Sequence, residues 1–193
     1  MKLIAPSMAY DTQIQAYRRE FLASGDSMDG CGSLRRFERT QDWLDQVEAL
    51  RRPETTPAGF VPMTQYIYVR ESDGKVVGVI QIRHCFNAYL EKYGGHIGYS
   101  VAPSERRRGY ATQMLRLVLP ECRRLGLSRV LITCLQGNEG SRRTIQKCGG
   151  VYESTVFEPA EGEFLERYWI NTGEQGLTEG KVHTPTFSGK TAI

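Results

Sequence analysis

The apolar positions in the first sixty residues repeat at helical spacing in two places. Residues 10–25 and residues 40–51 each carry an apolar side chain every three or four positions, which predicts two amphipathic helices, and Gly25 stands where the first would end. Residues 2–8 fit a short strand. The glycine-rich polar stretch DSMDGCGS, residues 26–33, predicts a loop between the two helices.

From residue 64 the apolar pattern changes to the alternation typical of strands. Residues 64–71 and 75–86 predict a β-hairpin, and residues 94–101 predict a third strand. The segments that follow are predicted as a helix at 109–126, a strand at 129–135, a helix at 139–148, and a closing hairpin at 151–157 and 163–171. This order predicts an α/β fold with a mixed, mostly antiparallel sheet flanked by helices.

The chain of 193 residues is long enough for one domain with a single core. We predict that residues 1–172 form this domain, with a helical part at residues 1–60 on the acceptor side and a cofactor-binding core at residues 64–171. From residue 173 onward the apolar periodicity is lost, so residues 173–193 are predicted to be an extended tail.

Composition narrows the class of protein. The 25 basic and 22 acidic residues give a net charge of only +3, too small to indicate a nucleic-acid partner. The five cysteines include no C-x-x-C pair, which favours a reducing compartment over a disulfide framework or a zinc site. No apolar run is long enough for a signal peptide or a membrane span. We therefore expect a soluble cytoplasmic protein without a metal site or a membrane partner.

The stretch VAPSERRRGYATQML, residues 101–115, joins a predicted strand to a predicted helix. Such a turn leaves the first backbone N–H groups of the helix unpaired at the positive end of the helix dipole, which favours a bound phosphate. Gly109 lets the backbone approach a ligand closely, Ala111 keeps the next contact small, and Thr112 adds a hydroxyl. The arginines at positions 106–108 raise the local positive potential.

These residues resemble a known family. Arg106-x-x-Gly109-x-Ala111 is similar to the R/Q-x-x-G-x-G/A signature of the GNAT superfamily, the GCN5-related N-acetyltransferases. Residues 99–103, before the turn, look like the usual strand end of that family, and Asn138 resembles the asparagine that opens its later helix. The resemblance covers residues 64–171, whereas residues 1–60 fit the family only in general plan.

The resemblance implies acetyl-CoA as co-substrate, with its pyrophosphate held by the backbone amides of residues 107–112. Residues 99–101 would pair through their backbone with the pantetheine arm, as an added strand does. Arg142 or Arg143 would reach the 3′-phosphate of the adenosine, and the alternative for this pair is a solvated helix face. The cofactor-binding residues predicted in this way are Tyr99, Ser100, Val101, Arg106, Arg107, Arg108, Gly109, Tyr110, Ala111, Thr112, Asn138 and Arg142.

The resemblance also implies an N-acetyltransferase that moves the acetyl group to a primary amine of a small molecule or a peptide. The amine would attack directly, without an acyl-enzyme, and the backbone N–H of Val101 would donate to the developing oxyanion. Many relatives carry a tyrosine acid seven residues after the asparagine, where this chain has Ile145. Some carry a glutamate base at the position of Thr133. Both usual acid and base positions therefore lack a titratable group.

His84 and His96 flank the same loop and are the candidates for proton transfer, since they would face one another across neighbouring strands. The alternative for each is a structural hydrogen bond. Tyr99, Tyr168 and Trp169 either line an acceptor pocket or belong to the core. Asp26, Asp29 and Glu38 either attract a cationic amine or belong to a solvated loop. Cys134 and Cys148 are assigned to the core.

Three further possibilities stay open at this point. The empty acid and base positions are compatible with a catalytically silent sensor of acyl-CoA. Arginine pairs scattered along the chain are compatible with a nucleic-acid-associated binding module, although no aromatic residues are interleaved with them as a stacking platform would need. A homodimer could form through the closing hairpin or the tail.

Overall fold

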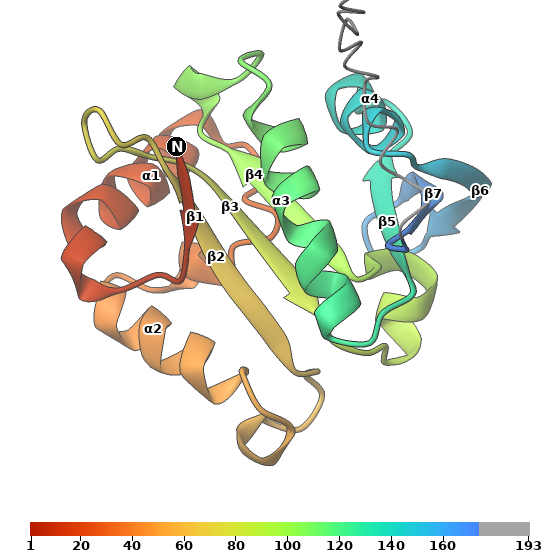
Figure 1. Cartoon of the computed structure of the whole chain (residues 1–193), viewed down its shortest axis with the longest axis horizontal. Helices are drawn as coiled ribbons and strands as arrows, with labels where there is room; N and C mark the ends of the chain where they lie inside the picture. Colours follow the sequence, from red (N-terminus) through yellow and green to blue (C-terminus); the bar gives the residue numbers. More distant parts are fainter. Residues whose placement is uncertain (174–193) are drawn as a thin grey trace, which may run out of the picture.

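Seven strands and four α-helices make up residues 1–173, the part of the chain that the computed structural model describes (Figure 1). The helices are α1 Asp11–Ser24, α2 Thr40–Ala49, α3 Tyr110–Arg124 and α4 Glu139–Lys147. The strands are β1 Lys2–Ile4, β2 Met63–Val69, β3 Val76–Arg83, β4 Ile97–Val101, β5 Arg129–Leu135, β6 Val151–Glu158 and β7 Glu163–Asn171. The predicted α/β fold with antiparallel strands and flanking helices is confirmed.

The first sheet has the strand order β1-β2-β3-β4, and every pairing in it is antiparallel. Because side chains alternate between the two faces of a sheet, its two faces bury different helices. Ile80 and Ile82 on one face pack with α3 residues such as Leu115, while Ile67 and Val79 on the other face pack with α1 and α2. The sheet is thus covered on both faces.

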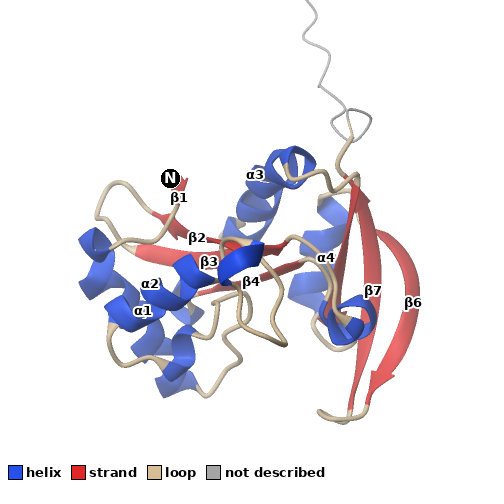
Figure 2. Cartoon of the chain, turned by 90° about the horizontal axis from the view of Figure 1, so that it is seen from below, coloured by secondary structure: helices blue, strands red, loops and turns tan. Residues whose placement is uncertain are grey.

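The second sheet has the order β5-β7-β6, again antiparallel, and Figure 2 shows it turned steeply away from the first. The two sheets meet at His96, which immediately precedes β4. Its backbone N–H donates to the Leu131 carbonyl at 2.7 Å, and its Nδ1 accepts from the Leu131 N–H at 2.9 Å. Beyond this contact β4 and β5 belong to different sheets, so the predicted single sheet is divided in two.

A loop of residues 25–33, here called the 25–33 loop, lies on the face of the first sheet that α1 and α2 cover. Two buried glutamines hold its backbone: Gln65 Nε2 donates to the Gly30 carbonyl at 2.9 Å, and Gln81 Oε1 accepts from the Gly32 N–H at 3.2 Å. A Cβ atom at Gly30 would lie only 2.1 Å from the Gly98 carbonyl oxygen. The loop backbone therefore packs directly on β4.

A few local expectations change. The predicted strand at residues 2–8 is confined to β1, because a short 3₁₀ helix, Met8–Tyr10, leads into α1. The predicted helix stop at Gly25 is confirmed by its left-handed φ of 72°. The loop expected before β4 contains a short π-helix, Leu90–Gly94. Of the predicted tail, all but residue 173 lies outside the described residues.

Candidate functional site

A cleft of about 1420 Å³ opens where the two sheets separate. Residues 97–101 of β4 line one side, and residues 133–135 of β5 line another. The N-terminal ends of α3 and α4 complete it with residues 109–112 and 138–141. This volume exceeds the usual range for a pocket that holds one small ligand. The cleft has room for a long co-substrate together with an acceptor.

The turn before α3 is built to present backbone N–H groups. Gly109 precedes the helix with a φ of 80°, and Arg107 also adopts a left-handed φ, of 63°. A left-handed conformation is costly for a residue with a side chain, and such strain concentrates at functional sites. Gln113 N donates to the Gly109 carbonyl at 3.1 Å, so the N–H groups of residues 110–112 precede the first bond of this helix. The predicted phosphate site thus has suitable geometry.

The three arginines of the turn point in different directions. Arg106 pairs with Asp26 of the 25–33 loop at 2.7 Å, and its Nε donates to the Val101 carbonyl at 3.3 Å. Arg106 and Arg107 line the cleft. Arg108 is absent from the lining of the cleft and pairs with Glu105 at 3.3 Å. Of the three arginines predicted to bind the cofactor, two therefore line the cleft.

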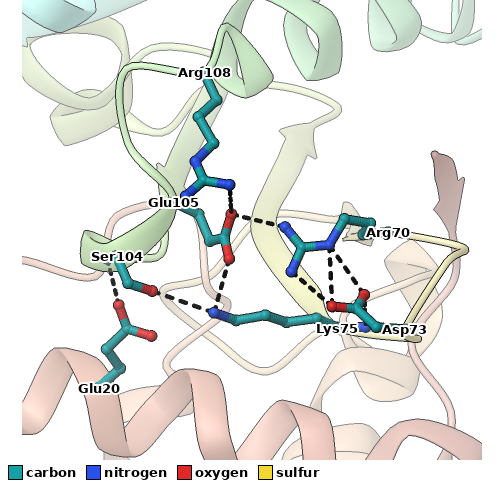
Figure 3. Close-up of polar contacts among 7 residues, drawn as sticks. All are labelled: Glu20, Arg70, Asp73, Lys75, Ser104, Glu105 and Arg108. Atoms are coloured by element: carbon teal, nitrogen blue, oxygen red, sulfur yellow. Dashed lines mark hydrogen bonds and ion pairs between the residues drawn. The ribbon is translucent and has the colours of Figure 1, made fainter.

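Glu105 lies under this turn and was missed at the sequence level (Figure 3). Its side chain is only 5% exposed, and its carboxylate binds Lys75 Nζ at 2.8 Å and Arg70 Nη1 at 2.9 Å, besides Arg108. The bond from Lys75 is the main cause that lowers its pKa. The one available signal was an acidic residue directly before three arginines. Its partners Arg70 and Lys75, in the turn between β2 and β3, could not be read from the sequence.

Strand β4 presents part of its backbone to the cleft. Arg83 N donates to the His96 carbonyl, and Ala102 N donates to the Val77 carbonyl. Since hydrogen-bonding direction alternates along a strand, the even-numbered residues 98, 100 and 102 direct their N–H groups to β3. The N–H groups of Tyr99 and Val101 therefore point to the edge of β4 away from β3.

The side chains of Tyr99 and Asn138 meet at the N-terminal end of α4. The Tyr99 hydroxyl lies 2.8 Å from Ser141 Oγ, and burial raises its pKa above the ordinary value of a tyrosine. Asn138 Oδ1 accepts from the Ser141 N–H at 3.0 Å and so caps the helix. Both residues line the cleft, and Asn138 has a structural role as well. Ser100, by contrast, points its hydroxyl at Tyr17 and at the Asp29 carbonyl.

Arg142 and Arg143 point in different directions, because neighbouring residues of a helix lie about 100° apart around its axis. Arg142 binds Glu166 through two 2.8 Å bonds and Glu139 through another, and it is absent from the lining of the cleft. Arg143 lines the cleft and pairs with Glu139 at 2.9 Å. Of the two residues considered for the 3′-phosphate, Arg143 has the suitable position, whereas the predicted residue Arg142 supports β7.

The two histidines do not face one another, because Arg83, not His84, lies opposite His96. His96 is 5% exposed, and burial, aided by the charge of Arg83, lowers its pKa to about 4. His84 lies 2.8 Å from Thr64 Oγ1, and burial lowers its pKa too. Neither lines the cleft. Both positions fit the structural alternative, which also explains why each histidine stays neutral.

The other candidates divide between the core and the cleft. Ile145 is fully buried, and Thr133 donates its hydroxyl to the Tyr93 carbonyl at 2.7 Å. Burial raises the pKa of the Cys134 thiol to about 11. Tyr168 is buried in the core and Cys148 is half-buried. The Trp169 indole donates to Glu153, and Glu38 is absent from the lining of the cleft.

The end of the cleft near Arg83, away from the phosphate turn, carries side chains of both charges. Asp29 and Arg83 line it, as do Tyr89 and, from the β6–β7 hairpin, Glu158 and Glu161. Within residues 1–173 no group of histidine, cysteine, aspartate and glutamate side chains could hold a metal ion. In the same part of the chain no helix combines the length and apolar character needed to cross a membrane.

The chain matches one protein family and many solved structures. The family described as "Acetyltransferase (GNAT) family" matches residues 31–150, starting within the helical N-terminal part. No curated protein sequence matches the chain.

Three solved structures illustrate the likeness. RimJ from Mycobacterium smegmatis, in complex with CoA-disulfide, is 22% identical with a TM-score of 0.63, over 92% of this chain and 83% of that one. The microcin C7 self-immunity acetyltransferase MccE, in complex with acetyl-CoA and AMP, is 16% identical with a TM-score of 0.63, over 88% and 91%. A chimera of the spermidine N-acetyltransferase SpeG from Vibrio cholerae and hSSAT is 13% identical with a TM-score of 0.59, over 89% and 97%. At these identities the likeness concerns the fold.

Proposed function

Since the chain belongs to the acetyltransferase (GNAT) family, whose co-substrate is acetyl-CoA, we propose that it transfers the acetyl group to a primary amine by direct attack, without an acyl-enzyme. The observation that carries this proposal is the cleft between the separated sheets, with the N-terminal turn of α3 at its edge. A turn of unpaired N–H groups suits a pyrophosphate, and a free strand edge suits the amide groups of pantetheine.

In this proposal the chain's residues share the binding of acetyl-CoA by position. The N–H groups of residues 110–112, with Arg106 and Arg107, hold the pyrophosphate. The backbone of Tyr99 and Val101 pairs with the pantetheine arm. Arg143 reaches the 3′-phosphate. These assignments require Arg106 and Arg143 to exchange carboxylate partners, Asp26 and Glu139, for phosphate oxygens.

The bound co-substrate supplies an activated acetyl group as a thioester. The Val101 N–H donates a hydrogen bond to the carbonyl oxygen, where negative charge develops during attack. The Tyr99 hydroxyl, kept protonated by burial, donates a hydrogen bond to the leaving sulfur. A thiol with a pKa of about 11 is a poor nucleophile at neutral pH, which is why Cys134 is given no covalent role. The proton of the amine passes to water in the open cleft.

Calorimetric titration with acetyl-CoA, with ADP as a control for simple phosphate attraction, tests the binding site. We expect the wild-type protein to bind acetyl-CoA and Gly109→Glu to lose binding, because a carboxylate would then stand among the N–H groups of the turn. Gly126→Glu is the matched control, since Gly126 has the same φ of 80° near the other end of α3 and open space around it. Equal binding by folded Gly109→Glu and Gly126→Glu would contradict the assignment of the turn.

A catalytically silent sensor of acyl-CoA is the second candidate, because Ile145 and Thr133 occupy the positions of the usual acid and base. Release of free CoA in the presence of amines separates the two. The panel includes spermidine, because the SpeG chimera is a spermidine N-acetyltransferase, together with amino acids, aminoglycosides and peptides. Thiol release above the buffer rate with any amine supports the transferase. Binding of acetyl-CoA without release from any amine supports the sensor.

A further inference from the structure

Arg83 is an arginine of the cleft whose charge has no anionic partner. It ends β3, on the face of the first sheet that the 25–33 loop covers, and its side chain is partly buried. Nη1 donates to the carbonyls of Gly94 and Gly95 at 2.8 and 3.1 Å. Across residues 1–173, Nε and Nη2 have no hydrogen-bond partner and no carboxylate lies within ion-pair distance of this guanidinium. Arg106 and Arg143, in the same cleft, each have one.

Nε and Nη2 are not among the buried polar atoms of residues 1–173 that lack a partner, so this edge of the guanidinium is open to a ligand that enters the cleft. Burial lowers the pKa of Arg83, an effect that the more distant charge of Asp29 only partly opposes. A Cβ atom at Gly98 would lie 3.6 Å from Nη2. Because residue 98 is a glycine, no side chain from β4 stands beside these free donors.

The position of Arg83 points to the acceptor and not to the co-substrate. Arg83 N bonds to the His96 carbonyl, at the start of β4, whereas the phosphate turn follows Val101 at the other end of this strand. The free edge of the guanidinium lies beside Gly98, three residues before Val101, which corresponds to about 10 Å at roughly 3.3 Å per residue. The phosphates of acetyl-CoA, held at the turn, are therefore remote from Arg83.

The surroundings of Arg83 suit a molecule with charges of both signs. Tyr89, Glu158 and Glu161 line the same cleft as Arg83. The Glu158 carboxylate is buried and accepts from the N–H groups of Ala160 and Glu161, so Glu161 offers the more available negative charge. Carboxylates attract the ammonium form of an amine, while the planar fork of a guanidinium matches a carboxylate with two parallel bonds.

We propose that Arg83 binds an anionic carboxylate of the acceptor, so that the preferred substrate is an amine that also carries a carboxylate and not a polyamine. This inference rests on the proposed acetyl transfer and names its substrate class. The carboxylate belongs either to a free amino acid or to an acidic residue of a peptide, since both present the same chemistry.

The test compares acceptors that differ only in the carboxylate: tyrosine with tyramine, and histidine with histamine, with spermidine as a polyamine. We expect kcat/KM to be about tenfold or more higher for the amino acid of each pair, the effect of one charge-assisted hydrogen bond. Arg83→Gln should remove this preference through a higher KM, and Arg83→Lys should keep part of it. Unchanged calorimetric affinity for acetyl-CoA shows that each variant retains the fold of the cleft.

The outcomes separate this inference from the proposed function. Equal kcat/KM within each pair, or an equal loss for both members in Arg83→Gln, would overturn the inference and leave the transferase standing. Bound acetyl-CoA with no release by any amine would overturn both. A peptide amide that begins with aspartate, compared with its asparagine counterpart, identifies the source of the carboxylate: a preference for aspartate supports a peptide acceptor, and a preference confined to amino acids supports a small molecule.

Discussion

At the scale of single residues, Tyr99 supplies a hydroxyl on the side of the cleft where the family's usual tyrosine is missing. Ile145 of α4, at that family position, is fully buried in the core. The Tyr99 side chain instead reaches α4 from β4, with its hydroxyl 2.8 Å from Ser141 Oγ. In the proposed mechanism, a hydroxyl from β4 therefore takes the part of the donor that α4 lacks.

Tyr99→Phe should lower kcat by about tenfold or more, the usual scale for the loss of one donor to a developing charge, with little change in acetyl-CoA affinity. Steady-state kinetics and calorimetry measure the two quantities. Tyr68→Phe is the control, since it removes another tyrosine hydroxyl, bonded to Gln113 at 2.7 Å, outside the cleft. A kcat equal to that of Tyr68→Phe would remove Tyr99 from the mechanism.

The roles of single residues were the least predictable from the sequence. The motif predicted the turn at Gly109, but it did not distinguish Arg142 from Arg143 or His84 from Arg83. Neighbouring residues in a strand point to opposite faces, and neighbours in a helix point about 100° apart. An error of one position therefore exchanges a cleft residue for a structural one. Glu105 was missed because its partners Arg70 and Lys75 are distant in sequence.

At the scale of elements, the phosphate turn is held from below by Glu105. This carboxylate ties the turn to the β2–β3 hairpin through Arg70 and Lys75, and Ser104 N is tied to α1 by the Glu20 carboxylate (Figure 3). The turn is therefore fixed to two other elements before any ligand arrives. Preorganised N–H groups bind an anion without a further ordering cost.

Glu105→Gln should lower the free energy of unfolding by about 2 kcal/mol at pH 7, because the buried carboxylate loses charge-assisted hydrogen bonds to the partly exposed Arg70 and Lys75. Since the folded pKa of Glu105 is lowered, its stabilisation is present above the ordinary pKa of 4.5 and is lost as pH falls through the folded value. Urea denaturation should therefore show wild type and variant converging in acid. Glu71, which pairs with Lys2 and the N-terminal ammonium at the surface, offers a control, and Glu71→Gln should cost far less stability than Glu105→Gln. Equal losses in both variants would contradict the role of Glu105.

At the scale of the whole molecule, two antiparallel sheets share one hydrophobic core and are joined by hydrogen bonds between His96 and Leu131. The periodicity of the sequence predicted nearly every strand and helix, because each buries one face. The periodicity did not predict the division into two sheets, since this depends on where the backbone hydrogen bonds that begin at His96 and Leu131 end. The family resemblance supplied the proposed oxyanion donor at Val101, which no pattern of apolar residues could have indicated.

The neutral state of His96 should make stability depend on mild acid. Its pKa falls from 6.5 in the unfolded chain to about 4 in the fold, so the unfolded chain binds the extra proton between these values. Stability should fall by about 3 kcal/mol as pH drops from 6.5 to 4, at 1.36 kcal/mol per pH unit. Urea denaturation at several pH values measures this. His96→Gln should flatten the dependence, and His84→Gln should retain most of it. An unchanged slope in His96→Gln would contradict the assignment.

The anchoring of the 25–33 loop bears on what a substitution in it can change. Gln65 and Gln81 hold the loop through its backbone, at Gly30 and Gly32. The side chains of Ser27 and Asp29, which line the cleft, take no part in these two bonds. Substitutions at Ser27 or Asp29 therefore change the surface that the loop presents to the cleft, while Gly30, Gly98 and the two glutamines keep the path of its backbone.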